Sequence, residues 1–441
     1  MGKKSKIKQL QKKIDAESDD EFDGTTMAGS VEDEYSESVA ASTAAGKGGA
    51  GDSGVNISEA VEMLSEKRSS TRETGLESLI THFQSSFGDA SDLSIEGYQD
   101  TLTEQMLRMI RRPNSVKEGK LCIQLLCLLA LYNGPEEDDF LNLFERPLQV
   151  LVDSASGSLH DLSGPALSCL ALISFVCGGV DASFRVWGYC QRKLFNDKTA
   201  VGDAGKAKAA EVAVRAAAAD AWALLATLRS GADVLASCRG DWGSLLQPLN
   251  VILTSGASSI EAKVSAGKCL AYMWELADEA SPGLETADSG LLLCDDPEII
   301  QETLNAVKTI TKESSKRISK KDRKEQRAEF RDIEEWLLQG EAPSDSLRVQ
   351  GAVLEIKSFG YMRLVEALKE VLGSGFHSSL RMFEVVRDML GVEHMTDDMD
   401  GAGEDRRVEK GSSLDKSRSN YRKQDRRSRE MNAEMYEGDE D

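Results

Sequence analysis

The chain is short of the residues from which metal sites and disulfide frameworks are built. It has only four histidines in 441 residues, well apart from one another, and none of its eight cysteines forms a C-x-x-C pair. A zinc site of the usual ligand spacing therefore cannot be assembled locally. Because most of the cysteines stand among leucine, alanine and isoleucine, we expect small buried thiols in a reducing compartment.

Long apolar runs and basic charge are also scarce. The longest apolar stretches, residues 121–132 and 166–180, are too short and too often interrupted to span a bilayer. We therefore expect a cytoplasmic protein with no membrane partner. Acidic residues outnumber basic ones by 75 to 53, for a net charge of −22, and such a chain repels nucleic acid at long range. The total hides an uneven distribution along the chain.

Apparent catalytic motifs fail on their context. Gly51-Asp-Ser-Gly54 resembles a serine nucleophile motif, but it stands in a Gly/Ala-rich segment with no framework for a triad. Residues 396–407 resemble a calcium loop but end in Arg407, where a bidentate carboxylate is required. We therefore expect no enzyme, no cofactor and no small-molecule substrate.

The two ends of the chain lack the apolar residues that a core requires. Residues 1–14 contain six lysines and no acid, and residues 15–37 contain ten acids and no base. The far end changes from acidic to strongly basic and back to acidic. Such segments bury too little apolar area to offset chain entropy. We predict disordered charged tails over residues 1–54 and 396–441.

The part between the tails has the pattern of helices. Apolar residues recur at helical spacing, and most of the eight prolines fall at breaks between apolar runs. Four dense apolar helices align on a small residue, at Cys127, Ala171, Ala223 and Ala271, with spacings close to those of armadillo or HEAT units. Each is preceded by a more amphipathic helix. The sequence therefore predicts an all-α fold, with an armadillo/HEAT-like helical-repeat solenoid over residues 55–340.

A basic segment closes the predicted solenoid. Ten bases face four acids between Lys308 and Arg331, and we predict a basic helix over residues 308–338. Phe330, Ile333 and Leu337 are expected to anchor its end. A helical projection separates the bases from the acids, which favours binding to a polyanion such as RNA. The candidate RNA-binding residues here are Lys316, Arg317, Lys320, Lys321, Arg323, Lys324, Arg327 and Arg331. The alternatives are a solvated face stabilised by ion pairs and a nuclear-localisation signal.

A second basic element lies in the C-terminal tail. Residues 406–429 contain ten bases and three acids, with few apolar residues between them. Arginine is prominent, as phosphate recognition favours. The candidate RNA-binding residues of this element are Arg418, Arg422, Lys423, Arg426, Arg427 and Arg429. The alternative is a charged tail that keeps the protein soluble.

Two blocks resemble one known family. Lys320-Lys-Asp-Arg-Lys-Glu-Gln-Arg-Ala-Glu-Phe-Arg-Asp332 resembles the basic signature of the interferon-related developmental regulator family. Leu368-Lys-Glu-Val-Leu-Gly-Ser-Gly-Phe376 is similar to the short C-terminal domain of that family, which implies a small helical domain over residues 341–395. The order of tails, repeats and basic helix is also that of the family.

The resemblance implies regulation of gene expression without catalysis. We expect a ribosome-associated regulator whose partners are rRNA and ribosomal proteins. Its basic helix would hold rRNA phosphates, and residues 406–429 would block the mRNA and tRNA path and so favour translational silence. The alternative function is a nuclear transcriptional co-regulator, an adaptor for transcription or chromatin factors, which would place the protein in the nucleus as well.

Overall fold

The computed structural model describes most of the chain between residues 56 and 392. The chain divides into two units, Met1–Gly54 and Val55–Asp441, and all described residues belong to the second. The two predicted tails lie outside them. The described residues are 56–86, 95–135, 138–153, 159–195, 205–237, 242–281, 290–294, 296–312, 320–341, 345–349 and 352–392.

Helices make up almost all of the described part of this unit. Those before the C-terminal region are α2 (Ile57–Leu64), α3 (Ser69–Ser86), η1 (Glu96–Tyr98), α4 (Gln99–Arg111), α5 (Val116–Asn133), α6 (Asp138–Asp153), η2 (His160–Leu162), α7 (Ser163–Cys177), α8 (Val180–Phe195), α9 (Gly205–Ala226), α10 (Gly231–Ser237), α11 (Trp242–Thr254), α12 (Ile260–Ala280), α13 (Gly290–Leu293), α14 (Pro297–Lys312) and α15 (Lys320–Gln339). The C-terminal region contains β1 (Asp345–Val349), β2 (Ala352–Ile356), α16 (Phe359–Leu372), η4 (Gly373–Gly375), α17 (Phe376–Met382) and α18 (Glu384–Met389).

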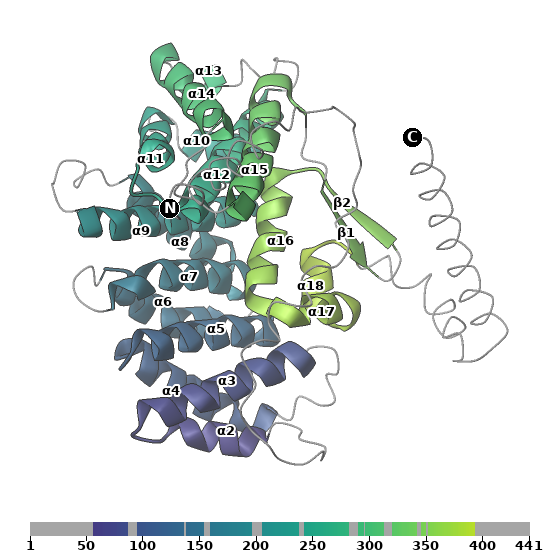
Figure 1. Ribbon diagram of the computed structural model, residues 1–441. Coiled ribbons are helices and arrows are strands. Elements are labelled where there is room, and N and C mark those ends of the chain that lie inside the picture. Colours follow the sequence, from purple (N-terminus) through teal and green to yellow (C-terminus); the bar gives the residue numbers. More distant parts are fainter. Residues whose placement is uncertain are drawn as a thin grey trace, which may run out of the picture. The chain divides into compact units, whose positions relative to one another are not determined.

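Five long helices form an inner layer. Helices α3, α5, α7, α9 and α12 pack each against the next, and Figure 1 shows them stacked in chain order. Helices α4, α6, α8 and α11 pack beside them as an outer layer. The positions aligned from the sequence, Cys127, Ala171, Ala223 and Ala271, stand in four of the inner helices and are all buried. The prediction of an all-α helical-repeat solenoid is confirmed.

Helix α7 shows why an inner helix can be almost entirely apolar. It packs against α5, α6, α8 and α9, so most of its surface is buried, although Gly164, Pro165 and Ser168 are partly exposed. The stretch His160–Cys177 is long and apolar enough to cross a membrane, yet 67% of it is buried within the structure. This is the pattern of a core helix, because a helix covered on nearly all sides has little need of a polar face.

Serine caps and prolines position several helix ends. Ser115 and Ser259 accept hydrogen bonds from the backbone N–H groups three residues later and so begin α5 and α12. Pro147 and Pro248, in contrast, lie inside α6 and α11 rather than at breaks. In α6 the proline removes the N–H that would bond to the carbonyl of Leu143. Leu143 is exposed, so water can reach the segment that loses this bond.

Helix α16 runs along the stack instead of extending it. It packs against α12, α9 and α5, and η4 continues it to α3 (Figure 1). At its start, the Ser358 hydroxyl and the Phe359 N–H donate to the Glu275 carboxylate of α12 at 2.5 and 2.7 Å. At its end, the Gln84 amide of α3 donates to the Val371 carbonyl at 3.2 Å. We call α16 with η4 the strap, because it joins both ends of the inner layer.

A β-hairpin precedes the strap. Strands β1 and β2 pair antiparallel, with Leu347 opposite Leu354, and β1 contacts α17. The inward residues Leu347 and Ile356 are buried, while Val353 on the other face is exposed. The region predicted as a helical domain over residues 341–395 thus contains α16, α17 and α18, together with a hairpin that the sequence did not indicate.

Candidate nucleic-acid interface and inner groove

The predicted basic helix over residues 308–338 is not one helix. Helix α14 ends at Lys312, α15 begins at Lys320, and the two pack against each other. The Thr311 hydroxyl lies 3.5 Å from the Phe330 carbonyl oxygen. In one continuous helix these two residues would be about 28 Å apart at 1.5 Å per residue. The expectation is therefore corrected: α14 and α15 are separate helices that pack side by side, and Val307 and Ile310 are buried as well as Phe330.

Helix α15 has one face fixed in the protein. Phe330, Ile333 and Leu337 are buried, as predicted, and the Phe330 and Ile333 side chains lie against Gly267 of α12. The Trp336 indole N–H donates to the Ala271 carbonyl at 3.0 Å. These contacts hold α15 on α12, and the basic side chains of its other face are presented on a rigid support.

The exposed face of α15 carries two of the predicted RNA-binding residues. Lys324 and Arg331 are exposed, seven residues apart, which is about 10 Å along the helix. Arg327 is half-buried and interacts with another residue. Lys320, Lys321 and Arg323 lie in the first turn of α15, and their side chains are outside the described part.

The remaining predicted residues lie outside the described part altogether. They are Lys316, Arg317, Arg418, Arg422, Lys423, Arg426, Arg427 and Arg429. The predicted basic residues that lie on α15 run from Lys320 to Arg331, a distance of about 17 Å along the helix axis. The helical projection placed the acidic residues on the side of the helix opposite the bases. Glu329 agrees with this, since it faces the protein and forms an ion pair with Lys268 of α12 at 2.8 Å.

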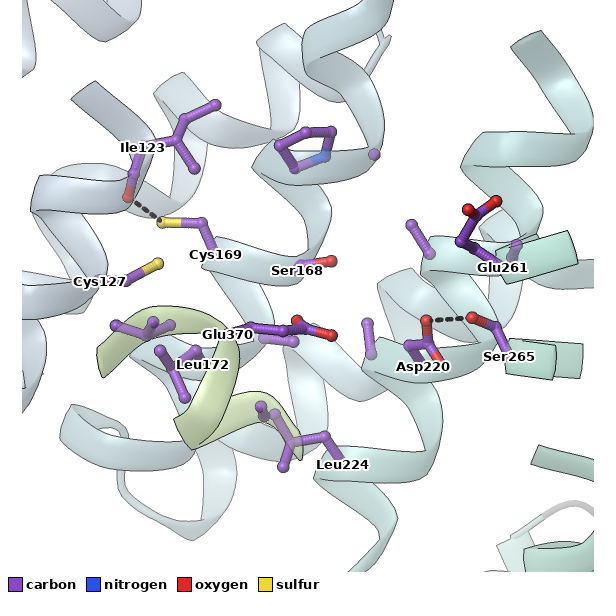
Figure 2. A pocket seen from close by; sticks show the side chains of 18 of the residues that line it. Ile123, Cys127, Ser168, Cys169, Leu172, Asp220, Leu224, Glu261, Ser265 and Glu370 are labelled. Carbon is purple, nitrogen blue, oxygen red and sulfur yellow. Dashed lines mark hydrogen bonds between the residues drawn. The ribbon is translucent and has the colours of Figure 1, made fainter. Parts of the chain in front are cut away.

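A groove of about 640 Å³ lies between the inner helices and the strap. Its walls come from α5, α7, α9 and α12 on one side and from α16 on the other (Figure 2). Figure 2 shows Glu370 of α16 near the centre of the groove, and Asp220 and Ser265 on α9 and α12 joined by a hydrogen bond of 2.7 Å. Small residues such as Gly164 and Ala217 leave this space open because they fill little of it.

A cluster of charges fixes the strap at this groove. Lys268 of α12 forms ion pairs with Glu329 of α15 at 2.8 Å and with Glu366 of α16 at 2.5 Å. Arg363 of α16 lies 3.9 Å from Asp220, 3.3 Å from Glu366 and 3.6 Å from Glu370. Two cations thus pair with four carboxylates from α9, α15 and α16. These ion pairs join helices that are distant in the sequence.

Burial changes the acidity of the cluster. It raises the pKa of the Asp220 and Glu370 carboxyls, and the charge of Arg363 offsets this only in part. Burial alone would lower the pKa of Lys268, but the charges of Glu366 and Glu329 outweigh it and raise that pKa. The cations therefore stay charged at neutral pH. Among the described residues no group of three His, Cys, Asp or Glu side chains is arranged to hold a metal ion.

The site residues predicted from the sequence do not include this cluster. A signal was present, because Asp220 and Lys268 interrupt otherwise apolar stretches of α9 and α12. A charged residue at a buried helix position requires a partner. The sequence does not show that the partners come from α15 and α16.

Comparisons with known proteins give a consistent result. The family model for interferon-related developmental regulators matches residues 26–337. Interferon-related developmental regulator 2 of Mus musculus is 27% identical over 342 residues, which is 75% of this chain and 71% of the relative. Interferon-related developmental regulator 1 of Homo sapiens is 22% identical over 348 residues, 76% of this chain and 71% of the relative. An uncharacterised protein of Schizosaccharomyces pombe is 22% identical over 306 residues, 66% of this chain and 64% of the relative.

Proposed function

The chain belongs to the interferon-related developmental regulator family and is a regulator of gene expression, and we propose that it acts by binding the ribosome. In this proposal the protein is not a catalyst. It contacts rRNA through α15, and its basic residues 406–429 occupy the mRNA and tRNA path, which favours translational silence. Its partners are rRNA and ribosomal proteins, and its place of action is the cytoplasm.

The observation that carries the proposal is the exposed pair Lys324 and Arg331 on a helix whose opposite face is buried. A cation on a fixed helix loses less conformational freedom on binding than one on a mobile segment, so more of its attraction to phosphate remains as affinity. Phosphate contacts of this kind position a protein on RNA without reading its sequence. Contacts to phosphates suit docking on folded rRNA, because most of its bases are paired and its phosphates are on the surface.

The acidic remainder of the chain supports the same proposal. With a net charge of −22, the protein as a whole is repelled by RNA. Contact is then favoured where basic residues are concentrated, as they are at α15 and at residues 406–429. Repulsion elsewhere suppresses binding to RNA in general and leaves a defined orientation on the ribosome.

Sedimentation through a sucrose gradient at low and high salt tests the proposal. We expect the wild-type protein to co-migrate with ribosomes, and K324E/R331E to move to the free fractions. In a titration of rRNA with the protein, the logarithm of the binding constant falls linearly with the logarithm of the salt concentration. Loss of two phosphate contacts should make this negative slope shallower by about 1.4, at roughly 0.7 per contact. Arg381→Glu is the matched control, since Arg381 is exposed on α17 and should leave binding unchanged.

A chain lacking residues 396–441 separates the two basic elements. It should still bind rRNA through α15, with lower affinity, but should no longer block translation in a cell-free system. Free migration of the wild-type protein at every salt concentration would contradict ribosome binding. It would favour the alternative of a nuclear co-regulator that works as a protein adaptor.

A further inference from the structure

A second groove lies on the other layer of the solenoid, between α4 and α6. Its volume is about 650 Å³, and it shares no residue with α15 or with the inner groove. One wall is the end of α4 and the turn that follows, including Ile110 and Pro113, and the other is one face of α6. The inference drawn from this groove is independent of ribosome binding.

The α6 wall is an apolar stripe without a covering element in the described structure. Leu143, Pro147 and Val150 stand at positions i, i+4 and i+7, so they line one face of the helix. Leu143 is 38% exposed and Val150 is 49% exposed, which is unusual for large apolar side chains on the same face. An exposed apolar stripe along a groove is a surface on which an amphipathic helix can bury its own apolar face.

The rim of the groove is basic. Arg111, Arg112 and Arg146 are exposed, and none of them has an ion pair with a described residue. None of the described residues that line the groove is an aspartate or glutamate, although the chain has 75 acidic residues. An adjoining hollow shares Arg111 and Arg112 and adds Lys67 and Arg108, together with the carboxylates of Glu66 and Glu104. In a protein with a net charge of −22, three exposed arginines without an ion pair to a described residue make this groove locally basic.

We propose that this groove binds an acidic amphipathic helix of another protein. The apolar face of that helix covers Leu143, Pro147 and Val150, and its carboxylates pair with Arg111, Arg112 and Arg146. Arginine suits this role because its planar guanidinium pairs with carboxylates through two hydrogen bonds. RNA fits less well, because no aromatic side chain on which a base could stack is among the described residues that line the groove.

Fluorescence anisotropy with the full-length protein and defined probes tests the proposal. The first probe is a labelled 20-residue helical peptide with leucines at i, i+4 and i+7 and glutamates on its flanks. The second replaces the glutamates by lysines, the third replaces the leucines by serines, and the fourth is a 20-nucleotide single-stranded RNA. We expect saturable binding of the first peptide, and binding at least about tenfold weaker for the second and third.

Variants locate the binding site. R111E/R146E should weaken binding of the acidic peptide at least about tenfold, and Leu143→Asp with Val150→Asp should do the same. The matched controls are Arg381→Glu and Val353→Asp, which change an exposed arginine and a 51% exposed valine elsewhere on the protein and should leave binding unchanged. Thermal melts followed by circular dichroism establish that each variant is folded.

Three results would overturn the proposal. The first is absence of saturable binding of the acidic peptide. The second is equal affinity of the wild-type protein and R111E/R146E for that peptide. The third is binding of the RNA probe that is lost in R111E/R146E while peptide binding persists, which would make the groove a nucleic-acid surface.

Discussion

The carboxylate of Glu118 shows how one residue can fix several segments. Its side chain has no exposed surface, and it accepts hydrogen bonds from Arg72 at 2.7 Å, Ser69 at 2.8 Å and Asn114 at 3.2 Å. Arg72 also donates to the carbonyls of Glu66 and Lys67. The pair therefore holds α3, α5 and the turn between α2 and α3 together at the start of the solenoid.

Arg72→Met is expected to destabilise the protein by about 3–5 kcal/mol, because it leaves the charge of Glu118 buried without a partner. The double variant R72M/E118Q should recover much of this loss, since it removes the unpaired charge as well. Urea unfolding of the two variants and of the wild type measures both effects. Equal stability of Arg72→Met and the double variant would show that Glu118 is not held by Arg72.

The same pair has a defined dependence on pH. Burial raises the pKa of Glu118, but the hydrogen bonds of Arg72 and Ser69 outweigh it, so the pKa lies below the ordinary value. A carboxyl with a lowered pKa in the folded state stabilises the protein above the pKa of the unfolded state. This contribution is lost as the pH falls through the folded value. Acid unfolding curves of Arg72→Met should therefore be flatter than those of the wild type below about pH 4.

Single residues of α15 show what a helical projection of the sequence can predict and what it cannot. A helical projection gives the angles between side chains, and the anchors Phe330, Ile333 and Leu337 were identified correctly. The projection also places Arg327 on the same side as the other bases, but in the structure Arg327 is half-buried beside the anchored face. Its exposure depends on neighbouring elements across the chain, which the projection does not contain.

At the scale of elements, Lys268 decides how two helices are held on α12. Its ammonium group lies between carboxylates from α15 and α16, and its side chain is only 11% exposed. Lys268→Met should destabilise the protein by about 3 kcal/mol, because Glu329 then loses its cation and Glu366 keeps only Arg363. Urea unfolding measures the loss, and hydrogen exchange should show faster opening of α15 and α16 than of α7.

An exposed ion pair provides the control for Lys268. Lys357 and Glu355 also form an ion pair, but both side chains are more than half exposed. Such pairs are screened by water and contribute about 0–1 kcal/mol. Lys357→Met should therefore leave stability nearly unchanged. An equal effect of the two methionine variants would mean that the Lys268 cluster does not stabilise the strap.

The inner helices, the hairpin and the division between α14 and α15 differ in how clearly the sequence predicts them. Four of the five inner helices, α5, α7, α9 and α12, were predicted because each contains an apolar segment longer than a strand requires. The hairpin was not, because its alternating residues, Leu347 with Val349 and Leu354 with Ile356, span only three positions in each strand. The division into α14 and α15 was missed for a different reason: basic residues continue in the sequence from Lys308 at the end of α14 into α15, so the pattern shows no break.

At the scale of the whole described unit, the strap changes the behaviour expected of a repeat protein. In a simple solenoid each repeat contacts only its neighbours, so distant repeats unfold independently. Here Gln84 of α3 and Val371 of the strap are 287 residues apart in the chain and share a hydrogen bond. The repeats were predictable because their pattern recurs locally. The strap was not, because its partners share no local pattern with it.

The strap should therefore make the solenoid unfold as one body, and releasing both of its ends should abolish this. Glu275→Ala removes the acceptor at its start, and Gly375→Ala places a methyl group 2.0 Å from the Gln84 carbonyl oxygen at its end. In the wild type we expect amides of α3 and α12 to exchange with the same dependence on denaturant. In the double variant, α3 should exchange at lower denaturant than α12. Gly256→Ala is the control, since nothing lies within 4 Å of the added carbon. Identical exchange of α3 and α12 in the double variant would show that packing between neighbouring repeats is sufficient for cooperativity, and that the strap only covers the groove.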